Sequence, residues 1–92
     1  MLKIKPTPKF KKELRKAIKR GCDENKLKYI IKLLSERKAL PIANQDHELK
    51  GKYKGYRECH IEPDWLLIYK IQDDILVLYL ERTGTHSDLF NK

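Results

Sequence analysis

The spacing of hydrophobic positions changes along the chain from strand-like to helical and back again. Residues 1–5 alternate between apolar and polar side chains, which predicts a short strand. Between Pro8 and Arg20 the apolar residues recur at i, i+4, i+7 and i+8, so one apolar stripe follows the length of a predicted helix. Thr7 fits the N-cap of this helix, Pro8 its first position and Gly21 its C-terminal stop.

A second helix is predicted after Asp23, which also fits an N-cap position. The apolar stripe of this helix is formed by Leu27, Ile30, Ile31 and Leu34. We expect the helix to continue to Leu40-Pro41, because a residue that precedes proline is disfavoured in the helical conformation. The two helices then form an antiparallel hairpin whose remaining surface is rich in lysine and arginine.

Strand-like segments fill the second half of the chain, after a loop at residues 41–55 that has no clear period. The predicted strands are Tyr56–Ile61, Trp65–Ile71 and Ile75–Leu80. Short turns join them, one of them containing Pro63, so the strands are expected to pair antiparallel as a meander. The order β-α-α-β-β-β predicts an α+β fold, in which the helical hairpin covers one face of a small antiparallel sheet and the other face stays partly open.

The composition limits the organisation and the setting of the chain. Ninety-two residues suffice for one domain, which we assign to residues 1–92. A formal net charge of +8 indicates a polyanionic partner, either nucleic acid or an acidic protein. Cys22 and Cys59 lie far apart and outside any metal-ligand spacing, which favours a reduced, cytoplasmic protein without disulfides. The sequence contains no apolar signal segment or membrane-spanning run, which argues against secretion and membrane insertion.

Titratable side chains gather near the predicted hairpin and near the C-terminus. Strand alternation places Glu58 and His60 on the same face, and it places Arg82 on one side with Leu76, Leu78 and Leu80. If the predicted strands are adjacent, an imidazole, a carboxylate, a guanidinium and a second imidazole converge at one end of the open face. These side chains belong to His60, Asp64, Arg82 and His86.

This set of side chains suits metal-free cleavage of RNA. The reaction needs a base for the 2′-hydroxyl proton, an acid for the 5′-oxygen leaving group and cations near the phosphoryl oxygens. An aromatic ring such as Trp65 or Phe90 can stack on a splayed base. Each residue also has a structural interpretation: Trp65 and Cys59 suit core positions, Arg57 can lie along the sheet, and single histidines in strands are more often surface residues. The three histidines fit no common zinc-binding pattern.

Three segments of the chain resemble a known family. Residues 46–51 read DHELKG, residues 56–69 read YRECHIEPDWLLIY and residues 82–90 read RTGTHSDLF. In this order and spacing they resemble the YafQ family of bacterial toxins, within the RelE/ParE superfamily. The resemblance covers nearly the whole chain and implies a RelE-like fold, namely a small antiparallel sheet packed on a helical hairpin. It also implies a ribosome-dependent mRNA endonuclease that is one half of a type II toxin–antitoxin pair.

The resemblance also implies an active site without a metal or another cofactor. The catalytic residues would be His47, His60, Asp64 and His86. His86 is the expected general acid, while the other three would act as base or would hold the substrate phosphate and ribose. The residues expected to bind substrate are Arg82, Trp65, Phe90 and Arg57, with Arg82 stabilising charge at the phosphorus. The tail Asn91-Lys92 is expected to crowd the site slightly.

The implied partners are a cognate antitoxin, the ribosome and mRNA, with no membrane. The free toxin would be a monomer and would form a hetero-oligomer with the antitoxin. Two other functions remain open at this stage, namely a ParE-type toxin that inhibits gyrase and a basic module that only binds nucleic acid. Replacement of His86 by alanine separates them, because only a nuclease should lose its toxicity.

Overall fold

A five-stranded sheet with the strand order β1-β5-β4-β3-β2 forms the centre of the molecule. The structure is a computed structural model that describes residues 1–90, so the expected position of Asn91-Lys92 lies outside the described residues. The strands are β1 (Lys3–Pro6), β2 (His47–Glu48), β3 (Arg57–Glu62), β4 (Trp65–Gln72) and β5 (Val77–Gly84), and the helices are α1 (Pro8–Lys19), α2 (Glu24–Ser35) and α3 (His86–Phe90). The predicted α+β class, the helical hairpin and the meander β3-β4-β5 are confirmed.

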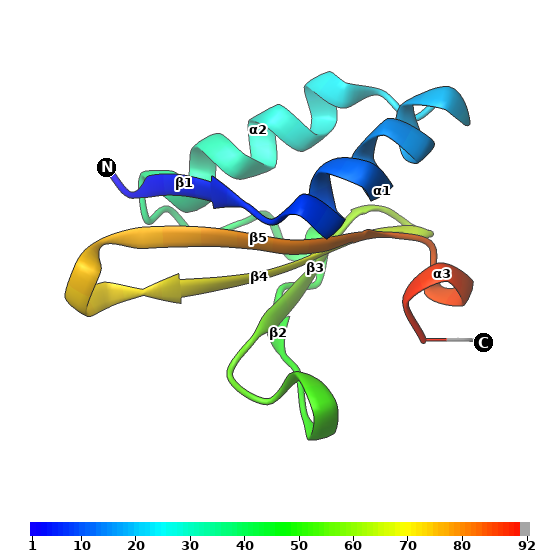
Figure 1. Cartoon of the computed structure of the whole chain (residues 1–92). Coiled ribbons are helices and arrows are strands. Elements are labelled where there is room, and N and C mark those ends of the chain that lie inside the picture. The colour runs from blue at the N-terminus through cyan, green and yellow to red at the C-terminus, as the bar shows by residue number, and fades with distance from the viewer. Residues whose placement is uncertain (91–92) are drawn as a thin grey trace.

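The two long helices cover one face of the sheet (Figure 1), and the main core lies between them and the strands. The helices contribute Phe10, Ala17, Leu27, Ile30 and Leu34, and the strands contribute Cys59, Ile61, Trp65, Leu67, Tyr69, Leu78 and Leu80. Both cysteines are free thiols, and burial raises the pKa of the Cys59 thiol to about 12. Among the described helices, none is long and apolar enough to cross a membrane.

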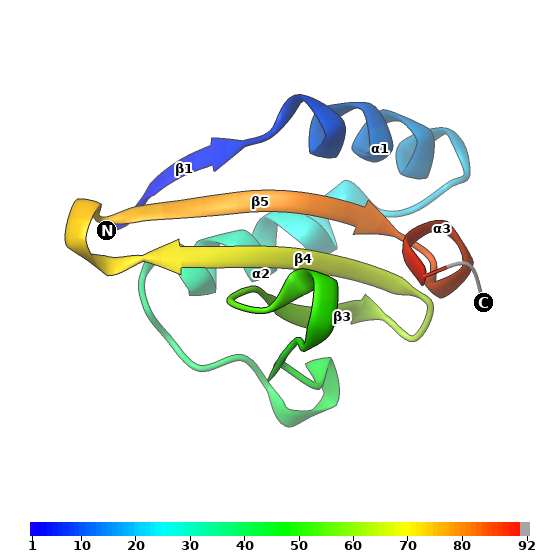
Figure 2. The ribbon, with the colours of Figure 1, turned by 60° about the horizontal axis from the view of Figure 1, so that its bottom comes forward.

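The first strand extends the sheet in a way that its sequence did not reveal. β1 pairs parallel with β5, in the register Lys3 opposite Val77 and Pro6 opposite Leu80, whereas the other strand pairs are antiparallel. Figure 2 shows β1 beside β5 at the edge of the sheet that leads into α1. Thr7 continues this junction, because its hydroxyl donates to the Glu81 carbonyl at 2.9 Å. The N-terminal segment therefore ties α1 to the last strand.

Helix α1 begins and ends at the residues that the sequence predicted. The Thr7 hydroxyl accepts a hydrogen bond from the backbone N–H of Phe10 at 3.0 Å, and Pro8 occupies the first turn. At the other end Gly21 adopts a φ of 96°, a left-handed conformation that glycine reaches without steric strain. The N–H groups of Gly21 and Cys22 donate to the carbonyls of Ile18 and Ala17, which satisfies the last turn.

Helix α2 starts at the predicted cap but ends five residues earlier than the sequence suggested. Asp23 accepts from the Asn25 N–H at 2.9 Å. The helix stops at Ser35 and does not reach Leu40-Pro41, so that prediction is wrong. Arg37 takes a φ of 58°, and the N–H groups of Arg37 and Lys38 donate to Leu34 and Leu33 at 3.0 and 2.9 Å. These bonds form a Schellman motif in which an arginine stands where glycine is usual.

An irregularity in β5 turns Arg82 to the open face. Ile68 pairs with Arg82, but the next residue of β4, Tyr69, pairs with Leu80, so Glu81 is an extra residue on β5. Such a bulge reverses the alternation of side chains beyond it. Leu80 therefore packs in the helix-side core while Arg82 shares the opposite face with Ile68, and the prediction that they lie on one side is wrong.

A second, smaller apolar cluster covers part of the open face. Its buried members are Leu66, Ile68 and Leu89, with Leu49, Tyr53, Tyr56 and Phe90 packed against them. These residues come from β4, from the loop before β3 and from the short helix α3, which the sequence analysis did not predict. Figure 1 places the loop around β2 and helix α3 on the side of the sheet away from α1 and α2. The open face predicted from sequence is thus partly closed at this cluster.

Candidate active site

The turn between β3 and β4 brings Asp64 against the start of α3. Asp64 Oδ1 accepts a hydrogen bond from the backbone N–H of His86 at 2.9 Å and lies 2.6 Å from Nδ1 of the same residue. The backbone N–H of His86 and then its imidazole hold the pKa of Asp64 below its usual value. A carboxylate bound to Nδ1 fixes the orientation of an imidazole ring and leaves Nε2 for the substrate.

His60 on β3 completes this group. Its ring centroid lies 5.5 Å from that of His86, with 67° between the ring planes, and its side chain is largely buried. The carbonyl of His60 accepts from Asn44 Nδ2 at 2.6 Å, which fixes the strand at this position. His60, Asp64 and His86 therefore lie together, and we call them the histidine cluster. They are three of the four residues that were expected to converge; the fourth, Arg82, lies on the same face but pairs with Glu13.

Glu58 links His60 to His47 and was given no role in the sequence analysis. The Glu58 residue is only 5% exposed, and its Oε1 lies 3.5 Å from Nε2 of His47 and 3.6 Å from Nε2 of His60. His47 is positioned by the pairing of β2 with β3, in which it stands opposite Glu58. Its Nδ1 lies 2.6 Å from the Gln45 carbonyl. Strand alternation placed Glu58 beside His60, but the two-residue strand β2 that brings His47 to them has no recognisable sequence pattern.

Helix α3 is held in place by its own cap and by α1. The Asp88 N–H donates to the Thr85 hydroxyl at 3.1 Å, and the Thr85 N–H donates back to Asp88 Oδ2 at 3.0 Å, which is a capping box. Arg20, just after α1, donates to the same carboxylate at 2.7 Å. Arg20 and then the Thr85 N–H keep the pKa of Asp88 well below its ordinary value. A β-carbon at Gly84 would lie 3.0 Å from the Asp88 side chain, so glycine permits the close turn from β5 into α3.

Arg82 lies on the same face but is already engaged by α1. Its Nη2 lies 2.5 Å from Glu13 Oε2, and its Nη1 donates to the Tyr53 hydroxyl at 3.1 Å. The hydrogen bond to Glu13 raises the pKa of Arg82 above its ordinary value. Across the sheet, Arg82 stands opposite Ile68 and Ile68 stands opposite Glu58, so two strand spacings separate Arg82 from Glu58.

The other three residues predicted to bind substrate lie in three different parts of the molecule. Trp65 is 3% exposed, lies in the helix-side core and donates from Nε1 to the Thr83 hydroxyl at 2.9 Å, so burial contradicts its predicted stacking on a base. Arg57 lies at the start of β3, away from the histidine cluster, and pairs with Asp46 at 3.2 Å and with Glu48 at 3.7 Å. Phe90 ends α3 on the open face, where its ring meets Tyr53 edge to face at 6.3 Å.

Comparison with known proteins gives this arrangement a family. A family model described as a bacterial toxin of a type II toxin–antitoxin system, YafQ, matches residues 2–91. The chain is 48% identical to the mRNA interferase toxin YafQ of Escherichia coli K12 over 88 residues. This aligned region covers 95% of this chain and 94% of that protein.

Solved structures give the same result. A toxin chain in a structure of the E. coli DinJ–YafQ complex is 46% identical, with a TM-score of 0.88 over 98% of this chain and 99% of that one. A metal-bound toxin from Helicobacter pylori is 41% identical, with a TM-score of 0.93 over 98% of this chain and 100% of that one. The fold is therefore that of the RelE-like toxins. Within that class, the chain belongs to the YafQ family of toxins from type II toxin–antitoxin systems.

Proposed function

We propose that the protein is an mRNA interferase, an endoribonuclease that cuts translated mRNA on the ribosome and is neutralised by a cognate antitoxin. The E. coli relative named above is an mRNA interferase, and its structure with DinJ is a toxin–antitoxin complex. The observation that carries the proposal here is the Asp64–His86 pair, with a 2.6 Å contact, beside the ring of His60 at 5.5 Å. Cytoplasmic location follows from a substrate that is being translated.

Cleavage transfers two protons. A base removes the proton of the 2′-hydroxyl, the 2′-oxygen attacks phosphorus, and the bond to the 5′-oxygen breaks as an acid protonates that oxygen. The products carry a 2′,3′-cyclic phosphate and a free 5′-hydroxyl, so atoms and electrons balance without another reactant. Histidines positioned within reach of both oxygens supply the two transfers, each of which contributes roughly 10²- to 10⁴-fold to the rate.

His86 is the acid in this mechanism. Its Nδ1 is bound to Asp64 and its side chain is partly exposed, so Nε2 delivers the proton to the leaving group. His60 is the base, with Glu58 beside it to orient the ring and balance the imidazolium that forms. His47 lies on the other side of Glu58 and is the more exposed imidazole, which suits a contact with the phosphate or ribose.

The cationic and aromatic parts of the site follow the same scheme. Arg82 supplies positive charge to the phosphoryl oxygens once the incoming phosphate competes with Glu13 for its guanidinium. Phe90, one helical turn after His86, is the ring available for stacking on a base beside the cleaved bond. The H. pylori toxin is metal-bound, but residues 1–90 of this chain include no group of three or more His, Cys, Asp or Glu side chains that could hold a metal ion.

The surface of α1 suits an anionic partner of large size. Its exposed cations are Lys9, Lys11, Lys12, Arg15, Lys16 and Lys19, and Glu13 is its one acidic residue. Such a basic surface meets ribosomal RNA in one complex and an acidic antitoxin segment in another. We propose that the free toxin is a monomer and that binding of the antitoxin creates the hetero-oligomer.

Mapping of mRNA cuts in cells after brief induction tests the proposal. Wild-type protein should cut within translated frames, and His86→Ala should abolish the cuts while Lys32→Ala, on the exposed surface of α2, leaves them unchanged. Asp64→Asn should reduce cleavage by roughly 10²-fold, because it weakens the orientation of His86. Growth arrest without cuts, unchanged by His86→Ala in a folded protein, would instead indicate a toxin that acts on gyrase or by binding alone.

A further inference from the structure

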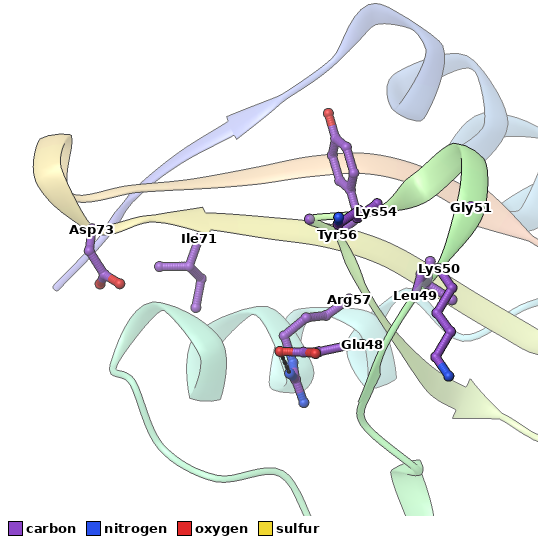
Figure 3. A pocket seen from close by; sticks show the side chains of 10 residues that line it. Glu48, Leu49, Lys50, Gly51, Lys54, Tyr56, Arg57, Ile71 and Asp73 are labelled. Atoms are coloured by element: carbon purple, nitrogen blue, oxygen red, sulfur yellow. Dashed lines mark ion pairs between the residues drawn. The ribbon is translucent and has the colours of Figure 1, made fainter.

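A cavity of about 560 Å³ opens at the edge of the sheet, where β4 extends beyond the start of β3. Its lining joins the two faces, because Leu49 and Tyr56 pack in the cluster on the open face whereas Ile71 packs against the main core. It lies between the loop after β2 and the outer end of β4, and Figure 3 shows Tyr56 standing above Arg57, which is paired with Glu48. Its lining residues include Leu49, Gly51, Gly55, Tyr56 and Ile71. A cavity of this size and mixed lining is in the range of small-ligand sites. We call it the Tyr56 cavity.

A row of aromatic rings connects the Tyr56 cavity to the candidate active site. The ring of Phe90 lies 6.3 Å from that of Tyr53, and the ring of Tyr53 lies 6.1 Å from that of Tyr56. Both contacts are edge to face, at 90° and 87°. Phe90 is on the same short helix as His86, and Tyr56 lines the cavity, so the row runs from the catalytic end of the face to the cavity.

Unpaired cations follow the same row. Lys52 Nζ lies 5.5 Å from the ring centroid of Tyr53, and Lys70 Nζ lies 5.5 Å from that of Tyr56, while Lys50 and Lys54 line the cavity. No ion pair joins any of these four lysines to a carboxylate within residues 1–90.

The acidic residues of the lining differ from these lysines, because each already has a cationic partner. Glu48 pairs with Arg57 at 3.7 Å, and Asp73 pairs with Arg37 at 2.5 Å. The free charge around the cavity is therefore positive, although two carboxylates lie in its wall.

We propose that the Tyr56 cavity is a second nucleotide subsite, which takes a base of single-stranded RNA away from the cleaved bond. The inference rests on the proposed function and extends it, because it assigns the path of the strand from the histidine cluster along Phe90, Tyr53 and Tyr56. In this path the Tyr56 ring stacks on the base, and Lys50, Lys54 and Lys70 contact the phosphates. The paired carboxylates of Glu48 and Asp73 remain able to accept hydrogen bonds from amino groups of the base.

The aromatic row decides between RNA and the other polyanion, an acidic peptide. A basic patch alone suits either ligand, since both carry negative charge. Successive rings with interleaved lysines and a cavity of nucleotide size are the features of single-strand binding surfaces, on which bases stack while cations follow the backbone. Continuity with a site that acts on RNA adds to this argument, because a bound strand must leave the site in one of two directions.

Binding of a short fluorescein-labelled single-stranded RNA to the full chain tests the subsite. His86→Ala serves as the background, so that the probe stays intact. In that background Tyr56→Leu should weaken binding roughly tenfold, while Tyr56→Phe keeps the ring and should bind within about twofold. Lys50→Ala/Lys54→Ala should lower the slope of log affinity against log salt by roughly 1 to 1.5. The matched control Lys28→Ala/Lys32→Ala, on α2, should leave both quantities unchanged.

The outcomes separate the subsite from the proposed function. If Tyr56→Leu and the lysine pair bind RNA like the control while the wild type still cuts mRNA, the subsite is wrong and the nuclease stands. If the wild type cuts no mRNA but the variants lose RNA binding as described, the subsite stands and the catalytic proposal fails. If the variants lose affinity for the purified cognate antitoxin and keep affinity for RNA, the occupant is an acidic peptide and the proposal is overturned.

Discussion

The carboxylate of Glu13 on α1 holds the guanidinium of Arg82 on β5, with Oε2 and Nη2 2.5 Å apart. The same carboxylate accepts from the Thr83 N–H at 3.3 Å. The side chain of Glu13 is only 17% exposed and that of Arg82 only 12%. Glu13 is the one acidic residue of a helix whose other charges are positive. Without substrate, the charge of the Arg82 guanidinium is therefore balanced by Glu13. The orientation of this side chain is fixed by a helix on the other side of the sheet.

Loss of the Glu13 carboxylate should lower the stability of the protein. Glu13→Ala leaves a largely buried guanidinium without its partner, so the free energy of unfolding should fall by about 1.5 to 3 kcal/mol. Urea unfolding measures this change in the free energy of unfolding. The control Glu24→Ala removes an exposed carboxylate from the first turn of α2 and should change the same quantity by less than about 0.5 kcal/mol. Equal stability of the two variants would show that the Glu13–Arg82 pair contributes nothing.

The Asp88 carboxylate should make the free energy of unfolding depend on pH in the acidic range. Its pKa in the folded protein lies below the ordinary 3.8, mainly because of Arg20, so its contribution is complete above that pH and is lost as the pH falls below it. At neutral pH, Asp88→Asn should lower the free energy of unfolding by about 1 to 2 kcal/mol, since it weakens the cap and removes the ion pair.

Urea unfolding from neutral pH down to strongly acidic pH checks this dependence. The difference between wild type and Asp88→Asn should shrink as the pH falls, because protonated Asp88 resembles asparagine. Asp74→Asn is the matched control, since Asp74 is exposed and forms no ion pair among the described residues. A difference that stays constant across this range would contradict the assignment of the Arg20–Asp88 pair.

The buried position of Trp65 predicts that its fluorescence does not respond to RNA binding. Trp65 is the chain's single tryptophan, and its ring packs in the core with Nε1 bound to Thr83. Its emission should be blue-shifted, poorly quenched by iodide and unchanged when single-stranded RNA binds. Phe90→Trp in a Trp65→Phe background gives the positive control, because that ring lies on the open face. Quenching of Trp65 itself by RNA would restore the predicted base contact.

The end of α2 offers a stabilising substitution. Arg37 adopts a φ of 58°, which costs a non-glycine residue about 1 kcal/mol, and its ion pair with Asp73 is exposed and weak. Arg37→Gly should therefore raise the free energy of unfolding by about 0.5 kcal/mol. Glu36→Gly, one residue earlier at a φ of −89°, should lower it instead. Thermal unfolding of both variants distinguishes the two positions.

The two helix ends show what local sequence can predict about the fold. Gly21 marks the end of α1 in the sequence because glycine reaches the left-handed region easily. Arg37 occupies the same kind of position after α2, but arginine carries no such signal, and tertiary packing after Ser35 decided the stop. The bulge at Glu81 and the parallel pairing of β1 were equally invisible, because both depend on contacts with strands that are distant in sequence.

The candidate site shows the same division. The turn containing Asp64 and the motif around His86 were distinctive enough for the sequence to suggest that they meet His60, and the structure brings these three residues together. Side-chain direction was harder to predict. Trp65 points into the main core on the same side of β4 as Leu67 and Tyr69, and an apolar run that is buried on both faces does not show which side that is. Glu58 gains its contact with His47 from a two-residue strand.

The parallel pairing of β1 with β5 also bears on how the protein is made. The hydrogen bond from Thr7 to Glu81 joins residues 74 positions apart. β1 can pair with β5 only after Val77 has been synthesised, because Lys3 stands opposite that residue. During synthesis the N-terminal strand and the helical hairpin emerge long before their partner strand, so the edge of the sheet is assembled last. Arg82 and His86 belong to the same final stretch of the chain. A truncated or still-growing polypeptide thus lacks both the β1–β5 pairing and the proposed acid, so under the proposed mechanism only the finished chain can cleave RNA.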